Sequence, residues 1–299
     1  MNYNNNVGLI NFGNTCFMNA SIQLLMCAKA LGSFLLLYDN DLSLYFDNVN
    51  IKEFDIYKYI QTYKDYISVE TNTLGPKILF NRYKILNTNY IGFTQEDSHE
   101  FLTFTLDDIL EQIKYSINQS ILNEEQKNRI INEVRKIFSI KFLQTVFYKN
   151  KNETSKTIVY ENILTLPISD DINTLEDAYE AYKTQDEEDF TITYKITELP
   201  KYLFIGLKRF KTTYTNITKI TKEIDINLET NIFGKNYKLK GFIMHDGSVF
   251  GGHYYTYASR KIGNEIKWFC YNDLLISEIS LEQIIKESKR AYLFLYSLC

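Results

Sequence analysis

The sequence predicts an α+β protein, with helices in the first half of the chain and strands in the second. Up to about residue 138, apolar residues recur at the three- and four-residue spacing of a buried helix face. From about residue 157, runs of β-branched and aromatic residues are separated by turn-forming Gly, Asn and Asp. The chain has 299 residues, of which 45% are hydrophobic, so it can bury a substantial core. This pattern fits two lobes or one bilobed domain.

Three helices are predicted in the first half of the chain. The first spans residues 15–37, where Met18, Ile22 and Leu25 recur at helical spacing. The Gly13-Asn14-Thr15 segment before it supplies a turn and a capping side chain. Two further amphipathic helices are expected at residues 97–117 and 123–138, and residues 53–65 have a weaker helical pattern.

Strands are predicted where β-branched and aromatic residues cluster in the second half. Turn signals at residues 233–236 and at Asp246-Gly247 separate some of these clusters. Short helices are expected to interrupt the strands at residues 174–183 and 281–289. The strand-forming runs are residues 157–160, 190–194, 202–205, 237–239 and 254–257.

The charge balance argues against a nucleic-acid-binding protein. The chain carries 33 Lys and Arg against 37 Asp and Glu, a formal net charge of −4, whereas nucleic-acid-binding domains are usually basic. No apolar run reaches the length of a membrane span, and residues 1–6 lack the basic start and apolar core of a signal peptide. We therefore expect a cytoplasmic protein, with the nucleus as a second compartment, that binds neither nucleic acid nor membranes.

The cysteines point to free thiols rather than to disulfides or zinc. There are four, scattered along the chain, and none forms a C-x-x-C pair. Only three histidines could supplement them as zinc ligands. We expect no metal and no cofactor, and a reducing compartment. The cysteines are Cys16, Cys27, Cys270 and Cys299.

Cys16 falls in the first turn of the first predicted helix. A thiol there meets unpaired backbone N–H groups and the positive end of the helix dipole, and both favour the thiolate. By itself this is weak evidence, since a cysteine at a helix start is more often structural than catalytic. Cys27, eleven residues later, lies on the same helical face, and we predict that it is a packed core cysteine.

His253 is the best candidate for a base that activates Cys16. It follows Gly251-Gly252 and opens an aromatic strand, so a narrow substrate could approach its imidazole closely. His99 lies within the second predicted helix and is interpreted as a surface or packing residue, and His245 is expected to line a loop. A hairpin that joins residues 254–257 to residues 268–273 would bring Asn272 or Asp273 beside His253, where either could orient the ring.

Four ordered motifs resemble those of the ubiquitin-specific proteases, which are papain-like cysteine proteases. Residues 8–19, GLINFGNTCFMN, are similar to the cysteine box of that family. Residues 251–255 and 268–273 are similar to its histidine box. Residues 95–102 and 199–210 resemble two further family signatures. The four motifs together cover nearly the whole chain and are far more specific than any one of them.

The resemblance implies a fold and a set of catalytic roles. It implies a single catalytic domain over residues 1–299, with a helical thumb lobe at about 7–140 and a β-rich palm lobe at about 141–299. Cys16 would be the nucleophile, His253 the base and Asn272 the orienting residue. Asp273 would assist, or would be the alternative third member. Asn11 would donate a side-chain N–H to the oxyanion that forms during the reaction.

The resemblance also implies residues that bind the substrate. Gln95, Asp97 and Tyr254 match positions that bind the extended C-terminus of ubiquitin. Helix capping is the alternative reading for Gln95 and Asp97. Most family members hold zinc with two C-x-x-C pairs in a β-sheet region called the fingers, and this chain has neither pair. We therefore expect a reduced, zinc-free fingers region, with little room for a long hairpin between residues 190 and 199.

The leading functional hypothesis is a deubiquitinating cysteine protease. It would hydrolyse isopeptide or peptide bonds after the C-terminal glycine of ubiquitin through a thioester on Cys16. Its partners would be ubiquitin and ubiquitinated proteins, or a ubiquitin-like modifier. The alternative is a catalytically weak or silent ubiquitin-binding module on the same scaffold. An unrelated Cys–His enzyme would leave the match at residues 95–102 unexplained.

Overall fold

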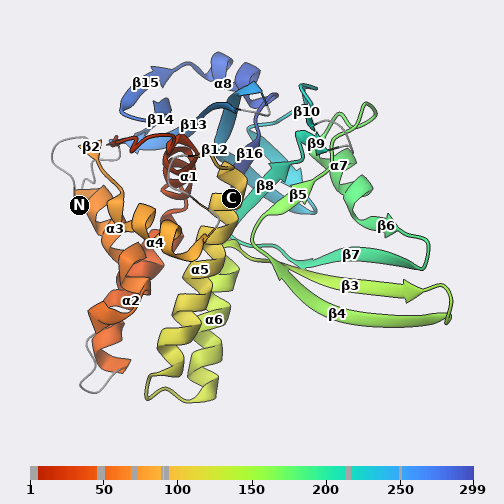
Figure 1. Ribbon diagram of the computed structural model, residues 1–299, viewed down its shortest axis with the longest axis horizontal. Coiled ribbons are helices and arrows are strands. Elements are labelled where there is room, and N and C mark those ends of the chain that lie inside the picture. Colours follow the sequence, from red (N-terminus) through yellow and green to blue (C-terminus); the bar gives the residue numbers. More distant parts are fainter. Residues whose placement is uncertain are drawn as a thin grey trace.

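Helices α1–α6 form one side of the molecule, and two larger β-sheets form most of the rest (Figure 1). The computed structural model describes residues 6–45, 51–68, 73–88, 90, 94–212, 217–248 and 251–299. Helices in the first half and strands in the second confirm the predicted α+β class. The helices are α1 (Cys16–Leu25), α2 (Lys29–Tyr45), α3 (Ile56–Ser68), α4 (Lys77–Leu86), α5 (Ser98–Asn118) and α6 (Glu124–Phe138); a 3₁₀ turn at Ile51–Glu53 and a parallel pair, β1 (Gly8–Leu9) with β2 (Thr73–Leu74), complete this half.

Helices α5 and α6 form where the sequence predicts them, and both begin at a capping side chain. Asp97 Oδ1 accepts a hydrogen bond from the backbone N–H of His99 at 2.6 Å. Asn123 and Gln126 form a reciprocal capping box at the start of α6. The apolar stripe of α5 is buried, as its spacing indicates. These two helices are therefore local consequences of the sequence.

The prediction of one helix over residues 15–37 is wrong, because the chain turns by 83° between α1 and α2. In a continuous helix the carbonyl of Gln23 would accept from the N–H of Cys27. Instead Cys27 N–H donates to Leu24 O at 3.0 Å, and the Gln23 carbonyl accepts from the guanidinium of Arg260 at 3.1 Å. A buried side chain from the far end of the sequence thus ends α1.

Two cores lie on opposite faces of an eight-stranded sheet. One face packs against the helices, and Thr256 Oγ1 on this face donates to the carbonyl of Ala20 in α1 at 2.7 Å. The other face packs against α7 (Leu175–Tyr182) and α8 (Leu281–Ser288). The strand order is β15-β14-β13-β12-β16-β8-β5, and β11 also pairs with β12. The strands are β5 (Leu164–Leu166), β8 (Tyr202–Leu207), β11 (Glu229–Ile232), β12 (Lys235–Ser248), β13 (Gly251–Ile262), β14 (Glu265–Asn272), β15 (Leu275–Ile279) and β16 (Leu293–Leu298).

The predicted turn at Asp246-Gly247 is wrong, because both residues belong to β12. Gly247 has φ +123° and pairs with Gly252 across the ladder. A Cβ on Gly247 would lie 2.5 Å from the Cα of Gly252, so the two glycines let the strands continue in close approach. His245 therefore lies on a strand and not in the loop expected from the sequence.

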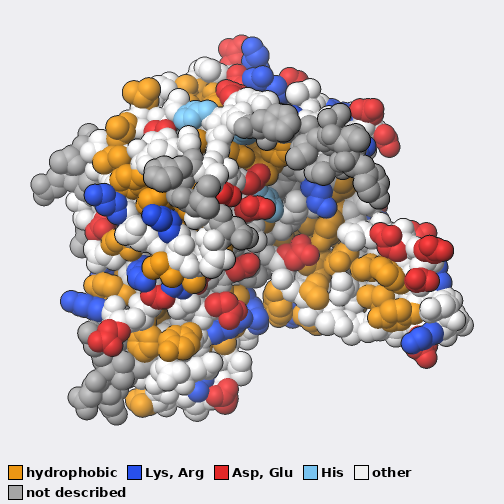
Figure 2. Space-filling view, viewed as in Figure 1, with side chains coloured by type: hydrophobic (Ala, Val, Ile, Leu, Met, Phe, Trp, Pro, Cys, Tyr) orange, Lys and Arg blue, Asp and Glu red, His pale blue; other side chains and the backbone are white. Residues whose placement is uncertain are grey.

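A second sheet, of order β4-β3-β7-β6, projects away from the rest of the molecule (Figure 1). Its two long neighbours, β3 and β4, pair over nine residues each, whereas β6 pairs with β7 over only three. Hydrophobic side chains are exposed on this sheet (Figure 2). They include Phe147, Tyr148, Ile158 and Tyr160. The strands are β3 (Ile140–Tyr148), β4 (Glu153–Glu161), β6 (Thr184–Asp186) and β7 (Phe190–Glu198); a separate hairpin joins β9 (Phe210–Thr212) to β10 (Ile217–Lys219).

In the part of the chain that the structure describes, no single helix is long and apolar enough to cross a membrane. Only α1 and α2 taken together pass a test of length and hydropathy, and they are bent sharply apart.

Candidate active site

The turn before α1 is built around the side chain of Asn11. Gly13 and Asn14 both have positive φ, +96° and +55°, as a tight turn before the helix requires. Asn11 Oδ1 accepts from the N–H of Gly13 at 2.9 Å and from the N–H of Thr15 at 3.1 Å. Thr15 occupies the N-cap position, but its hydroxyl bonds back into this turn and caps no helical N–H, so that part of the prediction is wrong. Cys16 is the first residue of α1 and is 3% exposed.

Asp273 holds this turn against the end of β14. Its carboxylate accepts from Asn11 Nδ2 at 2.9 Å and from Asn19 Nδ2 at 2.8 Å. Its backbone carbonyl accepts from the N–H of Leu9, also at 2.9 Å. The Asn11 amide has two hydrogens, and the bond to Asp273 uses one of them. Sequence reasoning missed Asn19. The available signal is a polar residue one turn after Cys16 in a helix that is mostly apolar.

His253 and Asn272 form the contact that the hairpin argument predicts. The Nε2 atom of His253 lies 2.6 Å from Oδ1 of Asn272. The two residues come from β13 and β14, which pair so that Thr256 lies opposite Tyr271. Of the two alternatives for the orienting group, the structure brings Asn272 to the imidazole and places Asp273 against Asn11 and Asn19.

Gln95 links the thiol of Cys16 to the strand that carries His253. Its Oε1 accepts from the N–H of Gly252 at 2.8 Å, and its Nε2 donates to the carbonyl of the same residue. The Nε2 atom also lies 3.6 Å from Cys16 Sγ. Within this described part of the site, the thiol and the imidazole of His253 form no direct hydrogen bond. Gln95, three residues before α5, therefore stands between the start of α1 and β13, and the N-cap residue of α5 is Asp97.

Asp97 and Tyr254 point into the protein beside this junction. The second oxygen of Asp97 accepts from the hydroxyl of Tyr292 at 2.6 Å, while the first caps α5. For Asp97, helix capping is thus what the structure shows. Tyr254 is 4% exposed, and burial together with the nearby Asp97 raises its pKa. Tyr292 lies 195 residues from Asp97, and no local motif points to it.

The other two histidines are suited to packing and not to base catalysis. His99 Nε2 lies 2.8 Å from Thr165 Oγ1, and burial lowers the pKa of its imidazole. This contact joins α5 to β5, in agreement with the packing interpretation. Burial, and then the charge of Lys219, lower the pKa of His245 to about 4, and its ring packs 4.5 Å from that of Tyr254. A lowered pKa makes each imidazole a weaker base.

Cys27 and Cys270 lack the position at the start of a helix that Cys16 has. Burial and the neighbouring Glu287 raise the pKa of Cys270 to about 11, so its reactive thiolate is scarce. Cys27 is buried in the core, as predicted, although it falls in the break after α1. Among the described residues, no group of three or more His, Cys, Asp or Glu side chains could hold a metal ion.

Comparison with known proteins identifies the family. A family model described as ubiquitin carboxyl-terminal hydrolase matches residues 7–296. The chain belongs to this family. Ubiquitin carboxyl-terminal hydrolase 25 of Arabidopsis thaliana is 26% identical over 97% of the chain, and ubiquitin carboxyl-terminal hydrolase 8 of Saccharomyces cerevisiae is also 26% identical over 97%. The chain spans 47% of the first relative and 70% of the second.

Solved structures of this hydrolase family show the same fold. The solved structure of the SAGA Ubp8/Sgf11/Sus1/Sgf73 DUB module bound to ubiquitin aldehyde matches 99% of the chain with a TM-score of 0.77 and 24% identity. The chain covers 70% of that protein. The predicted ubiquitin-specific protease fold is therefore confirmed.

Proposed function

We propose that this hydrolase-family chain is a deubiquitinating thiol protease, which cleaves isopeptide or peptide bonds after the C-terminal glycine of ubiquitin. The observation that carries the proposal is the junction at Gln95, where the Cys16 thiol meets the strand that holds the His253–Asn272 pair. Residues from three distant parts of the sequence converge there. Family membership supports the same reaction.

In the proposed mechanism, Cys16 Sγ attacks the carbonyl carbon of the terminal glycine. His253 takes the thiol proton through Nδ1, because Asn272 occupies Nε2, and then delivers it to the leaving amine. The resulting thioester is hydrolysed by water. The second N–H of the Asn11 amide supports a role as donor to the oxyanion, since the bond to Asp273 fixes the orientation of that amide. Contacts between thiol and imidazole often tighten only when substrate binds.

We propose that ubiquitin or ubiquitinated proteins are the substrates, with a ubiquitin-like modifier as the alternative. Gln95, Asp97 and Tyr254 lie together beside Cys16, which supports a path for an extended tail along α5. The exposed hydrophobic side chains of the projecting sheet support a contact with the body of the modifier. A panel of ubiquitin and ubiquitin-like probes would show which modifier is preferred.

Ubiquitin with a C-terminal electrophile is expected to label the native protein and the Cys270→Ala control, but not Cys16→Ala. The control is matched, because it removes a thiol of raised pKa from the same chain. Labelling of Cys16→Ala would overturn the assignment of the nucleophile. Labelling without turnover of a fluorogenic ubiquitin substrate at micromolar protein would favour the silent binding module.

The amide of Asn272 is expected to matter more for turnover than the carboxylate of Asp273. Asn272→Ala should lower kcat by about 10²- to 10⁴-fold, because the imidazole loses the group that orients it. Asp273→Asn keeps one acceptor for Asn11 and Asn19 and should cost less. Steady-state kinetics of both variants provide the measurement. A larger loss for Asp273→Asn would reverse the two roles.

We further propose that residues 1–299 act as one catalytic domain of two lobes that meet near residue 140. We also propose the cytoplasm as its location, with the nucleus as a second compartment, and neither nucleic acid nor a membrane as partner. The four free cysteines support a reducing environment. Imaging of a fluorescent fusion would test the location, and a secreted pool of the protein would contradict it.

A further inference from the structure

Arg260 is a buried cation at the C-terminal end of α1, the helix that begins with Cys16. It lies on β13, seven residues after His253, and is 3% exposed. Its Nη1 atom lies 2.7 Å from Cys27 Sγ, and its Nη2 atom lies 3.4 Å from the hydroxyl of Tyr66 in α3. Burial of a guanidinium costs free energy that these contacts must offset. A buried guanidinium is therefore expected only where its contacts offset the free-energy cost of removing it from water.

The same guanidinium sets where the nucleophile helix ends. Nη2 donates to the backbone carbonyl of Gln23 at 3.1 Å and to its side-chain oxygen at 3.3 Å. It meets the negative end of the α1 dipole, where a cation is favourable. The Gln23 side chain is held in turn, because Tyr66 donates to its oxygen at 2.8 Å and its amide donates to Val7 O at 2.6 Å. The last turn of α1 is thus fixed from several sides.

Arg260 also contacts the strand that carries Asn272. Its guanidinium carbon lies 4.8 Å from the centre of the Tyr271 ring, a cation–π contact. Tyr271 immediately precedes Asn272, and its hydroxyl donates to Asn6 Oδ1 at 2.6 Å. One side chain therefore touches α1, which begins with Cys16, and β14, which ends with Asn272, while it sits on the strand of His253.

We infer that Arg260 is a positioning residue, which fixes the three elements of Cys16, His253 and Asn272 relative to one another. The inference rests on the proposed function of these three residues. Arg260 touches neither the thiol nor the imidazole in these contacts, so it acts through α1 and Tyr271. Loss of the Arg260 contacts should misplace the thiol relative to the imidazole and slow the chemical step more than substrate binding, because two of the three predicted ubiquitin-binding residues, Gln95 and Asp97, lie just before α5, outside α1, β13 and β14.

The test compares Arg260→Met and Arg260→Lys with a matched control, Arg209→Met. Arg209 is also 3% exposed and bonds backbone carbonyls, those of Ala291 and Lys222 at 2.7 Å among them, but it contacts the other core. For each protein, an electrophilic ubiquitin probe is reacted to completion to count the reactive sites. The kcat is then expressed per titrated site, and KM is taken from the same measurements. This normalisation removes the effect of a lower folded fraction.

We expect kcat per site to fall at least tenfold in Arg260→Met with KM within about twofold, to recover in part in Arg260→Lys, and to stay within twofold in Arg209→Met. A wild-type kcat per site in Arg260→Met would overturn the inference. If Arg260→Met does not fold, the kcat per site of Arg260→Lys decides, because lysine keeps the charge but loses the planar fork of N–H donors. A kcat per site below wild type then supports the inference, and a wild-type value overturns it. The rate at which iodoacetamide alkylates Cys16 in the same variants needs no ubiquitin, so it separates failure of this inference from failure of the proposed function.

Discussion

Replacement of His253 with alanine is expected to lower kcat for a fluorogenic ubiquitin substrate by about 10⁴-fold or more. His253 contacts Asn272 through Nε2. It directly follows Gly252, whose backbone N–H donates to Gln95. Without the imidazole, neither the thiol proton nor the leaving amine has a positioned partner. Steady-state turnover at saturating substrate measures the loss, and binding of ubiquitin should change little.

His99→Gln is the matched control for this substitution. His99 also makes a side-chain hydrogen bond, with Nε2 at 2.8 Å from Thr165 Oγ1, but this bond joins α5 to β5. Glutamine can keep that hydrogen bond, so kcat should remain within a few-fold of the native value. Turnover by His253→Ala that matches this control would rule out His253 as the base.

The contact between His253 and Asn272 was predictable from sequence because its geometry is local. Residues of β13 and β14 pair around a tight hairpin, with Ile262 opposite Glu265. The ladder continues residue by residue from that turn to the pair Thr256–Tyr271, so the next pair along it is Tyr255 with Asn272. His253 lies two residues beyond Tyr255 on β13, and its ring reaches Asn272. The start of α1 is local too, because Asn11 organises the residues within four positions of it.

The parts that sequence reasoning missed depend on distant side chains. The break between α1 and α2 lies in a stretch of good helix formers, and it is set by Arg260, 233 residues from Cys27. The bond from Tyr292 to Asp97 likewise joins residues 195 positions apart. Helix α3 has a weak pattern, because its buried face is shared by isoleucines and tyrosines, and no pattern predicted α4. Local periodicity carries no signal for such contacts.

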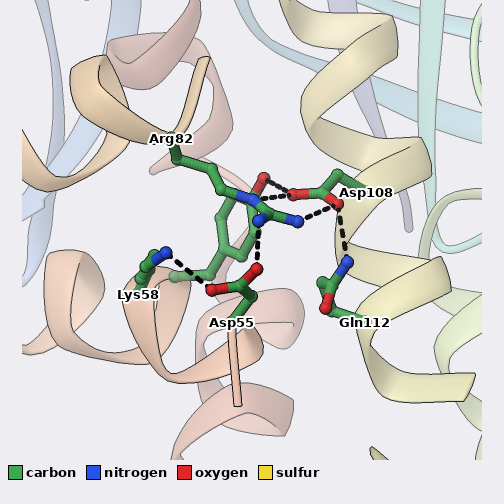
Figure 3. A network of polar contacts seen from close by, with 6 residues as sticks. Asp55, Lys58, Arg82, Asp108 and Gln112 are labelled. Carbon is green, nitrogen blue, oxygen red and sulfur yellow. Dashed lines mark hydrogen bonds and ion pairs between the residues drawn. The ribbon is translucent and has the colours of Figure 1, made fainter. Parts of the chain in front are cut away.

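The second large effect is expected in a buried ion-pair network among α3, α4 and α5 (Figure 3). Arg82 donates from Nε and Nη2 to the two oxygens of Asp108, at 2.8 and 2.7 Å. Tyr59 also donates to Asp108, Gln112 donates to it at 3.0 Å, and Asp55 pairs with the third nitrogen of Arg82. Arg82 and Asp108 are only 5% and 9% exposed, so neither charge could be solvated alone.

Arg82→Met is expected to destabilise the protein by about 3–5 kcal/mol at pH 7, because it leaves Asp108 charged and buried. In the native protein, burial raises the pKa of Asp108, but hydrogen bonds from Arg82, Tyr59 and Gln112 outweigh it and hold the pKa below its ordinary value. The network therefore stabilises the fold fully above the ordinary pKa of aspartate, and this contribution is lost as pH falls through the lower folded value. Urea denaturation across that range measures both effects.

Without Arg82, burial of Asp108 prevails and raises its pKa, so the deficit of Arg82→Met relative to the native protein should shrink as pH falls and Asp108 takes up a proton. Arg82→Met combined with Asp108→Leu should recover most of the loss at pH 7, since no unpaired charge remains. Lys136→Met, which removes a solvent-exposed ion pair with Glu133, should change stability by no more than about 0.5–1 kcal/mol. A deficit in Arg82→Met that is equally large at every pH would instead point to lost packing around Arg82 and not to the charge of Asp108.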